Sequence, residues 1–451
     1  MKSLQAILSS VFLAKQRFFR PTAYTFYRRL LSLQELDQAK LAAFNLNRRR
    51  ALLFHAGTTT EKYAHWKSAN ASAFAYCTED TWDGLPILTR EEVSDDLESL
   101  RSKVFPRTRL VESTTGGSTG TPLRVWHDRL YPREAIAWRL LGWWNVPLGQ
   151  HAAHTWRLRR TRRLSQLANT ALWWPTQRIW LNAAAMRKED LNRFIDEFNH
   201  LRPQLLQGYV GALEHVAAHI IQQELVVPSP IAIWTTAAPL NPNSRHTIQE
   251  AFQAPVYDQY GSCEVPFIAA ECERHEGLHV FSDVVQVDIV RDDGSPADAG
   301  QVGRVLVTDL DNRVAPLIRY DTGDRAAWLA GPCSCGLPFP RITTVRGRVS
   351  DTLVMNDGTT IAGDYLTTIF DNYTEEIRQF QVQKITASQL RVLVCPRKQK
   401  ANLDSIISAV HAALRANIGK TTMIEFQIVE NISADAGKTR FVLDLTRRNL
   451  A

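Results

Sequence analysis

Apolar residues recur at helical spacing over most of the first hundred positions and again in the middle of the chain. LNRFIDEFNHLRP (191–203) and LEHVAAHIIQQEL (213–225) repeat them every three or four residues, which predicts amphipathic helices. We expect helices to dominate from residue 132 to residue 225. The short apolar runs IAIWTTAAPL (231–240) and APVYDQYGSCE (254–264) predict buried strands that end in loops. Alternating helices and strands indicate an α/β domain with a partly parallel sheet.

Strand patterns replace helical ones after residue 300. GRVLVTDL (303–310) and LIRYDTGDRAAWLA (317–330) begin this strand-rich part. The last hundred residues follow a strand, strand, helix, strand order, given by QFQVQKI, QLRVLVCP, LDSIISAVHAALRANIG and MIEFQIVE. The predicted architecture is therefore α/β, with a large N-terminal domain of mixed sheets and helices (1–350) and a small α+β C-terminal domain (351–451).

A glycine- and hydroxyl-rich segment, STTGGSTGTP (113–122), precedes a predicted strand, PLRVWHD (122–128). Glycines allow tight turns and close approach to a ligand. Successive backbone N–H groups in such turns form a concavity for phosphate oxygens. The segment is therefore a candidate phosphate-binding loop in a strand–loop–strand cradle, and a flexible linker is the competing interpretation.

Composition is that of an ordinary globular protein, with 45% hydrophobic and 22% charged residues in 451. No apolar run approaches the ~20 residues of a spanning helix. The first twenty residues resemble a short signal peptide, but Phe12 stands where a small residue should precede the cleavage site. An amphipathic helix that continues into FYRRLLSLQEL is favoured, and we expect a cytoplasmic protein, with the oligomeric state and a peripheral membrane contact left open.

The net charge of +7 favours anionic ligands or surfaces. The basic cluster RLRRTRR (157–163) is either a solvated face or a contact for CoA phosphates, a polyanionic acceptor or anionic lipid. No aromatic residues alternate with the basic ones as in a nucleic-acid platform, so we expect no nucleic-acid partner. Six cysteines in a chain of this length do not indicate a disulfide scaffold, which agrees with a reducing compartment.

Four further motifs follow in order: YGSCE (260–264), RYDTGD (319–324), RGRVSD (346–351) and DAGKTR (435–440). Each has an ordinary structural explanation, since YG and TGD are good turn sequences and a loop lysine is usually solvated. Together with the glycine-rich loop and LPILTREEV (85–93), they resemble the adenylate-forming superfamily. The chain is most similar to its phenylacetate–CoA ligase family, which includes capsule-biosynthesis proteins, and the resemblance covers nearly the whole chain.

The resemblance implies that ATP activates a carboxylic acid as an acyl-adenylate, which then passes its acyl group to a nucleophile. The β- and γ-phosphates would bind to Thr115, Gly117, Ser118, Thr119, Gly120 and Thr121. The adenine and ribose would contact Ala237, Ala238, Pro239, Asp258, Tyr260, Gly261 and Asp324. Glu264 would ligate Mg²⁺, Arg348 would contact ribose or phosphate, and Lys438 would stabilise charge at the α-phosphate. Asp351 would be the hinge about which the small, mobile domain rotates.

Three positions depart from the family pattern. Cys263 replaces the hydroxyl residue that often precedes the metal-binding glutamate, and a thiol is a weaker donor. Ala238 replaces a glutamate of the adenine wall, and Thr121 replaces a lysine of the glycine-rich loop. These changes keep open a non-catalytic, nucleotide-binding descendant of the family.

A possible metal site consists of Cys272, Cys333 and Cys335 with either His279 or His275. Cys333 and Cys335 are separated by one residue, which is tighter than the usual zinc spacing. Some members of the resembled family carry a structural zinc cluster with CxCG just before the hinge, so zinc is the favoured interpretation and unliganded thiols the alternative. His279 is preferred because it opens an apparent strand, VFSDVVQV (280–287).

The sequence motifs do not specify which acid is activated or which group accepts the acyl group. The family favours an aryl or arylacetic acid, for which Trp143, Trp144, Trp234 and Tyr209 are candidate pocket residues, although tryptophans more often belong to the core. CoA is the expected acceptor, and an amine, a sugar hydroxyl or a carrier protein is the alternative.

Overall fold

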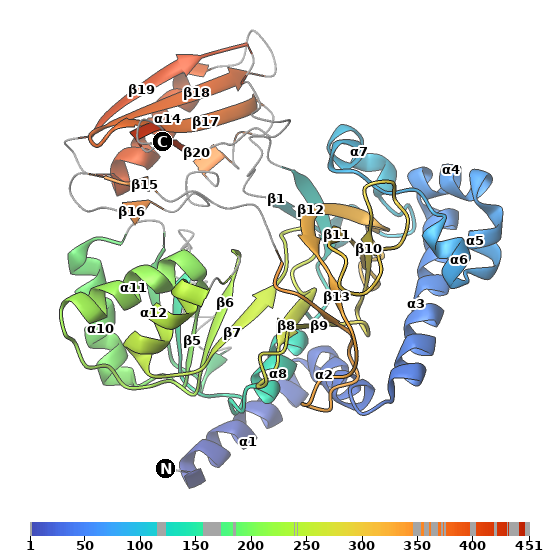
Figure 1. The fold of residues 1–451 in the computed structure, drawn as a ribbon, viewed down its shortest axis with the longest axis horizontal. Coiled ribbons are helices and arrows are strands. Elements are labelled where there is room, and N and C mark those ends of the chain that lie inside the picture. The colour runs from blue at the N-terminus through green and yellow to red at the C-terminus, as the bar shows by residue number, and fades with distance from the viewer. Residues whose placement is uncertain are drawn as a thin grey trace.

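The computed structural model describes most of the chain, with gaps. The described residues are 2–114, 123–156, 173–183, 186–238, 240, 242–345, 353–355, 360–361, 369–370, 373, 376–396, 403–418, 422–430, 432 and 442–446. Figure 1 shows a large body with helices on its flanks and the C-terminal strands at the opposite end from α1.

The first hundred residues are helical, as predicted. The helices are α1 (Lys2–Phe19), α2 (Pro21–Leu33), α3 (Gln38–Thr59), α4 (Glu61–Ala69), α5 (Ala71–Tyr76), α6 (Glu79–Asp83) and α7 (Arg90–Asp95). Several of these helices have N-terminal side-chain caps. Asp37 caps α3 and Thr89 caps α7, where Glu92 completes a capping box. No helix in the described part of the chain has the length and apolarity needed to cross a bilayer.

A nine-stranded sheet forms the centre of the body. Its strands are β3 (Ala152–Trp156), β4 (Arg178–Asn182), β5 (Leu205–Tyr209), β6 (Ala232–Thr236), β7 (Val256–Tyr260), β8 (Ala269–Glu271), β9 (Leu278–Val280), β13 (Trp328–Leu329) and β14 (Arg341–Ile342). The spatial order is β13-β14-β9-β8-β7-β6-β5-β3-β4. Strands β4, β3, β5, β6 and β7 are parallel and the remaining pairs antiparallel, which confirms the partly parallel sheet.

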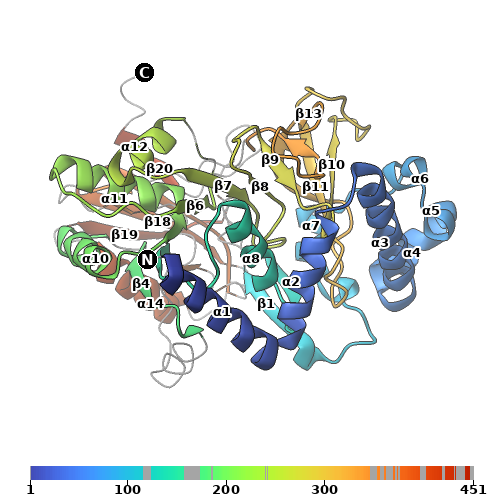
Figure 2. The ribbon, with the colours of Figure 1, turned by 90° about the horizontal axis from the view of Figure 1, so that it is seen from below.

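Helices cover both faces of this sheet (Figure 2). They are α8 (Glu134–Trp143), α10 (Lys188–Leu201), α11 (Val210–Gln222) and α12 (Pro242–Phe252). Successive strand residues alternate between two apolar cores. Ala153, Leu206 and Ile233 pack with α10 and α11, whereas Ala152 and Leu205 face the core that includes α8. Both faces are therefore buried, as in parallel sheets generally.

The glycine-rich loop is preceded by β1 (Leu110–Thr114) and followed by β2 (Arg124–Asp128). These strands pair antiparallel, with Thr114 opposite Arg124. The strand predicted after the loop is confirmed, whereas residues 115–122 of the loop lie outside the described part of the chain. At its base Arg109 donates two hydrogen bonds to the Asp128 carboxylate, at 2.9 and 2.7 Å.

Two other sheets complete the fold. β10 (Val285–Val290), β11 (Gly303–Asp309) and β12 (Tyr320–Ala326) form an antiparallel sheet. The C-terminal sheet has the order β19-β18-β17-β20. Its elements are β17 (Ile377–Thr386), β18 (Gln389–Pro396), α14 (Leu403–Asn417), β19 (Met423–Ile428) and β20 (Val442–Asp444), preceded by the short hairpin β15 (Leu353–Val354) and β16 (Thr360–Ile361). They share a separate apolar core, and the predicted C-terminal order of elements is confirmed.

The structure adds to one sequence prediction and corrects another. Among residues 132–225, where we expected helices to dominate, three strands (β3, β4 and β5) also occur, and the sequence pattern did not predict them. The strand expected at 280–287 is broken: β9 ends at Val280 and β10 begins at Val285. Asp283, between them, forms a fully buried ion pair with Arg139 of α8, so the break between the two strands is tied to this helix.

Candidate functional site

The site begins at the carboxyl end of β7, where the chain turns sharply at Gly261. A Cβ atom added at Gly261 would lie 2.0 Å from the Pro266 carbonyl oxygen, far inside van der Waals contact. Only glycine fits this position, which explains the YG pair at the end of a buried strand. The turn presents Tyr260 on one side and leads to Glu264 on the other.

Tyr260 and Asp324 meet across two sheets. The Tyr260 hydroxyl donates a 2.8 Å hydrogen bond to Asp324 Oδ2 and lies 3.4 Å from Thr322 Oγ1. Burial, reinforced by the Asp324 charge, raises the pKa of Tyr260 well above its usual value. The phenol therefore stays protonated and holds the carboxylate in place.

Glu264 is buried, with 6% of its surface exposed, and is held by two groups that sequence reasoning missed. The Tyr320 hydroxyl donates to Glu264 Oε1 at 2.9 Å, and Arg90 Nη1 lies 3.5 Å from the same oxygen. Arg90 reaches this position because the preceding Leu88 exchanges backbone hydrogen bonds with Arg319 and Asp321, at the start of β12. Both residues stand in motifs already singled out, RYDTGD and LPILTREEV, but their contacts depend on tertiary docking.

His127 of β2 connects the phosphate-loop hairpin to the turn before Glu264. Its Nε2 lies 2.9 Å from the Cys263 carbonyl oxygen. Since a carbonyl only accepts, Nε2 carries the proton. Burial, with the Arg133 charge, lowers the pKa of His127 to about 3, so the ring is neutral at physiological pH. Cys263 thus contributes its backbone carbonyl to this contact, whatever its side-chain type.

The predicted adenine wall follows β6. Ala237 has φ +71°, a left-handed conformation that non-glycine residues rarely adopt, and it turns the chain at the strand's end. Thr236 Oγ1 donates to Gln259 Oε1 at 3.0 Å, which ties this turn to β7. Ala237 and Ala238 therefore lie beside the strand that carries Tyr260.

Asp258 of β7 is buried in a network with Glu271 and Arg245. Its backbone N–H donates to Glu271 Oε2 at 2.9 Å, and Glu271 also accepts from Arg245 at 2.6 Å. Burial, and then the Glu271 charge, raise the pKa of Asp258 to about 7. For Glu271, burial raises the pKa, but His275 and Arg245 outweigh it and leave that pKa lowered.

Other predicted site residues lie outside the described part of the chain. They are Thr115, Gly117, Ser118, Thr119, Gly120, Thr121, Pro239, Arg348, Asp351 and Lys438, together with the basic cluster 157–163. Their roles remain predictions from the sequence.

The candidate pocket tryptophans are largely core residues. Trp143 packs against the rings of His279, Phe281 and Phe339. Trp144 stacks on Tyr257 at 5.1 Å and meets Trp234 edge-on at 5.3 Å. Only Tyr209, tilted 4.5 Å from Trp156 at the carboxyl ends of β5 and β3, keeps partial exposure.

The structure brings Cys272, His279, Cys333 and Cys335 together, with their donor atoms all within 4.8 Å of one another. The Sγ atoms of Cys272 and Cys333 are 3.7 Å apart, and Cys335 Sγ is 3.4 Å from His279 Nε2. Tetrahedral zinc with bonds of about 2.3 Å separates two thiolates by about 3.8 Å. The donor set and its spacing therefore fit zinc.

A backbone carbonyl orients the histidine of this cluster. His279 Nδ1 lies 3.2 Å from the Phe339 carbonyl oxygen, which leaves Nε2 as the ligand atom, as is usual for metal-binding histidines. His275, the alternative, instead contacts Glu271 at 3.2 Å. The four residues come from the end of β8, from β9 and from the segment between β13 and β14.

Comparison with known proteins finds similarity along most of the sequence. The CapK C-terminal domain family matches residues 353–444. Protein CapK of Staphylococcus aureus is 23% identical over 447 residues, covering 95% of both chains. Phenylacetate-coenzyme A ligase of Thermus thermophilus is 25% identical over 239 residues, 48% of this chain and 52% of that one.

The fold is that of adenylate-forming ligases. The crystal structure of 2-hydroxyisobutyryl-CoA ligase, in the postadenylation state with R3-HIB-AMP, superposes with a TM-score of 0.61 over 93% of both chains, at 16% identity. The chain is thus similar in sequence to CapK and to phenylacetate-coenzyme A ligase, and similar in fold to a CoA ligase.

Proposed function

We propose that the protein uses ATP to activate a carboxylic acid as an acyl-adenylate and then transfers the acyl group to CoA. The observation that carries this proposal is the meeting of Tyr260, Asp324 and Glu264 at the carboxyl end of β7, where open α/β sheets bind ligands. The hydrogen bond from Tyr260 to Asp324 and that from Tyr320 to Glu264 support it.

In the first step, a carboxylate oxygen of the acid bonds to the α-phosphorus of ATP, and the bond to the β-phosphate oxygen breaks. In-line displacement at phosphorus depends on positioning and charge stabilisation. Tyr260 would lie against the adenine, and Asp324 would accept from the ribose hydroxyls. Lys438 would stabilise the charge that develops on the α-phosphate.

Glu264 is the proposed magnesium ligand, and bound Mg²⁺ would neutralise charge on the phosphates. A buried carboxylate held by Tyr320 and Arg90 is a suitable hard oxygen donor. His127 would position the turn before it through the Cys263 carbonyl.

Zinc is the proposed occupant of the Cys272, His279, Cys333 and Cys335 cluster. Four protein ligands leave no open position, so the site would be structural. No catalytic role is assigned to it.

In the second step, the thiol of CoA would attack the acyl carbon and AMP would leave. The CoA ligases among the compared proteins support this acceptor. An aryl or arylacetic acid is the proposed substrate because of the phenylacetate–CoA ligase match. The alternatives are transfer to an amine, a sugar hydroxyl or a carrier protein, and a non-catalytic, nucleotide-binding role.

Acid-dependent exchange of pyrophosphate into ATP, measured across a panel of aryl, arylacetic and aliphatic acids, tests the first step. Adding CoA or an amine to the active mixture then identifies the acceptor by its product. Folded protein that exchanges pyrophosphate with no acid of the panel would contradict an enzymatic function.

Lys438→Ala should reduce exchange by about 10²–10³-fold, because it removes a preorganised charge that acts on the developing α-phosphate charge. ATP binding, followed by calorimetry, should be retained. Lys40→Ala is the matched control, since Lys40 is exposed and pairs only on the surface with Asp37. Unchanged exchange in Lys438→Ala would refute the role of this lysine.

A further inference from the structure

Helix α1 is fastened to the body along one side. Phe12, 2% exposed, meets Trp138 edge-on at 5.8 Å and stacks near Trp173 at 6.4 Å. Ser9 Oγ donates to the Leu148 carbonyl at 2.6 Å. The outer side of α1 is therefore presented in a fixed orientation.

That outer side carries an apolar stripe. Ile7, Val11, Ala14 and Phe18 follow one another at intervals of four, three and four residues, so they share one helix face. All are exposed: Ile7 by 58%, Phe18 by 80% and the following Phe19 by 67%. Two adjacent, exposed phenylalanines at a helix end mark an interaction surface rather than a core.

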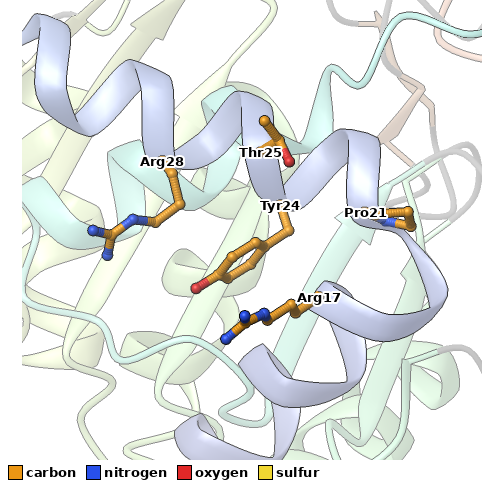
Figure 3. A pocket seen from close by; sticks show the side chains of 5 residues that line it. All are labelled: Arg17, Pro21, Tyr24, Thr25 and Arg28. Carbon is orange, nitrogen blue, oxygen red and sulfur yellow. The ribbon is translucent and has the colours of Figure 1, made fainter.

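A groove runs between this stripe and α2. A hollow of about 610 Å³ is lined by Arg17, Pro21, Tyr24, Thr25 and Arg28. A second hollow, of about 430 Å³, is lined by Leu13, Ala14, Arg17, Phe18 and Tyr24. Arg17 and Tyr24 line both, so the two hollows adjoin and together form the groove. Figure 3 shows the Tyr24 ring lying between the side chains of Arg17 and Arg28.

The groove is polar and cationic at one end and apolar at the other. Residues 1–34 contain six basic residues and no aspartate or glutamate. Some of these cations have partners, since Arg20 pairs with Glu134 and Lys15 donates to the Trp174 carbonyl. Arg17 and Arg28 are exposed and form no ion pair with the described residues.

We propose that α1 and α2 form a docking surface for an anionic lipid bilayer. Arg17, Arg28 and the Tyr24 hydroxyl would bind lipid phosphate groups, while Phe18 and Phe19 enter the boundary between headgroups and acyl chains. Helices that lie on membranes combine these two features, an apolar face and basic residues beside it.

The charge pattern favours a bilayer over a second copy of the chain. In a two-fold symmetric dimer each patch meets its own equivalent, so the groove arginines of the two copies would face like charges. Such contacts are unfavourable, whereas anionic headgroups complement them. The surface also lies at the opposite end of the molecule from the C-terminal sheet (Figure 1), so docking would leave that end free.

Vesicle sedimentation of the full chain tests the proposal. At 0.1 M salt the protein should bind vesicles of phosphatidylcholine and phosphatidylglycerol in a 70:30 ratio, and bind pure phosphatidylcholine much less. R17Q/R28Q should weaken binding about thirtyfold, since each basic residue near an anionic surface contributes a several-fold factor. F18S/F19S should weaken it about tenfold or more by removing the inserted rings. Salt at 0.5 M should also release the protein.

K103Q/R107Q is the matched control, because it also removes two exposed cations but lies outside α1 and α2. The side chains of Lys103 and Arg107 are 68% and 65% exposed. This variant should bind like the wild type, and thermal unfolding should show that all variants are folded. Failure of the wild type to bind would overturn the proposal. An equal loss of vesicle binding in K103Q/R107Q would overturn it as well. So would a protein that binds no vesicles but forms a dimer in sedimentation equilibrium, if F18S/F19S dissociates that dimer. Pyrophosphate exchange is not needed for this test, so it is independent of the proposed catalysis.

Discussion

At the scale of single residues, burial controls the chemistry of Asp258. Only 5% of its surface is exposed and Glu271 lies beside it, so its pKa rises to about 7. Its folded-state pKa is thus above the ordinary aspartate value of 3.8, and the folded state holds the proton more tightly between these two values. The tighter proton binding stabilises the folded state at low pH, and this stabilisation is lost as the pH rises towards and through 7.

Asp258→Asn should therefore be more stable than the wild type at pH 8, by roughly 4 kcal/mol at most, because the amide cannot ionise. The difference should shrink towards pH 4. Urea unfolding of both proteins from pH 4 to pH 8 measures it. Parallel stability profiles for the two proteins would show that Asp258 titrates normally.

The sequence identified Tyr260, Glu264 and Asp324 because each belongs to a motif with a recognisable order. The structure puts the first and last of these in direct contact. Tyr320 and Arg90 escaped notice because nothing in their local sequence indicates that Leu88 docks beside β12. Groups supplied by such long-range docking cannot be inferred from a motif alone.

At the scale of elements, sequence patterns located long helices and the C-terminal strands but missed β3, β4 and β5. These strands have five residues each, and β3 and β5 are covered on both faces. They therefore lack the polar–apolar alternation that marks a half-exposed strand. Placed among amphipathic helices, such runs are indistinguishable from buried helix segments.

The zinc proposal concerns how elements are joined. Cys272 follows β8, and Cys333 and Cys335 lie between β13 and β14, so bound metal would close a loop of about sixty residues. Cys335→Ser should lose the metal and lower the melting temperature by several degrees, since the ligation energy contributes to folding.

Elemental analysis of purified protein should give about one zinc per chain, and chelation should reproduce the lowered melting temperature of Cys335→Ser. Cys395→Ser serves as control, because Cys395 lies in β18 and bonds to the Glu430 carbonyl instead. Wild-type protein purified without zinc and unaffected by chelators would leave the cluster as reduced thiols.

At the scale of the molecule, the buried pair of Arg139 and Asp283 joins α8 to the break between β9 and β10. Both side chains are fully buried, and the guanidinium also lies over the rings of Trp143, Phe281 and Phe339. Removing one charge of such a pair leaves the other uncompensated.

Asp283→Asn should therefore lower the free energy of unfolding by about 3–5 kcal/mol, measured by urea denaturation. Asp298→Asn is the matched control, because Asp298 pairs with Arg291 while 84% of its side chain is exposed. Equal effects of the two substitutions would indicate that the buried pair contributes no more than a surface one.

The helices that open the chain bind to segments made much later. Asn45 bonds to Ser282, Arg48 to Leu310, Tyr63 to Pro316 and Trp82 to Asp288, at separations of 206 to 262 residues. At about 5–20 residues per second, a ribosome takes roughly ten seconds to a minute to synthesise these partners. During that interval the apolar faces of α3 and α4 have no native surface to cover them. The order of synthesis therefore leaves the nascent N-terminal helices open to binding by a chaperone until their partners emerge.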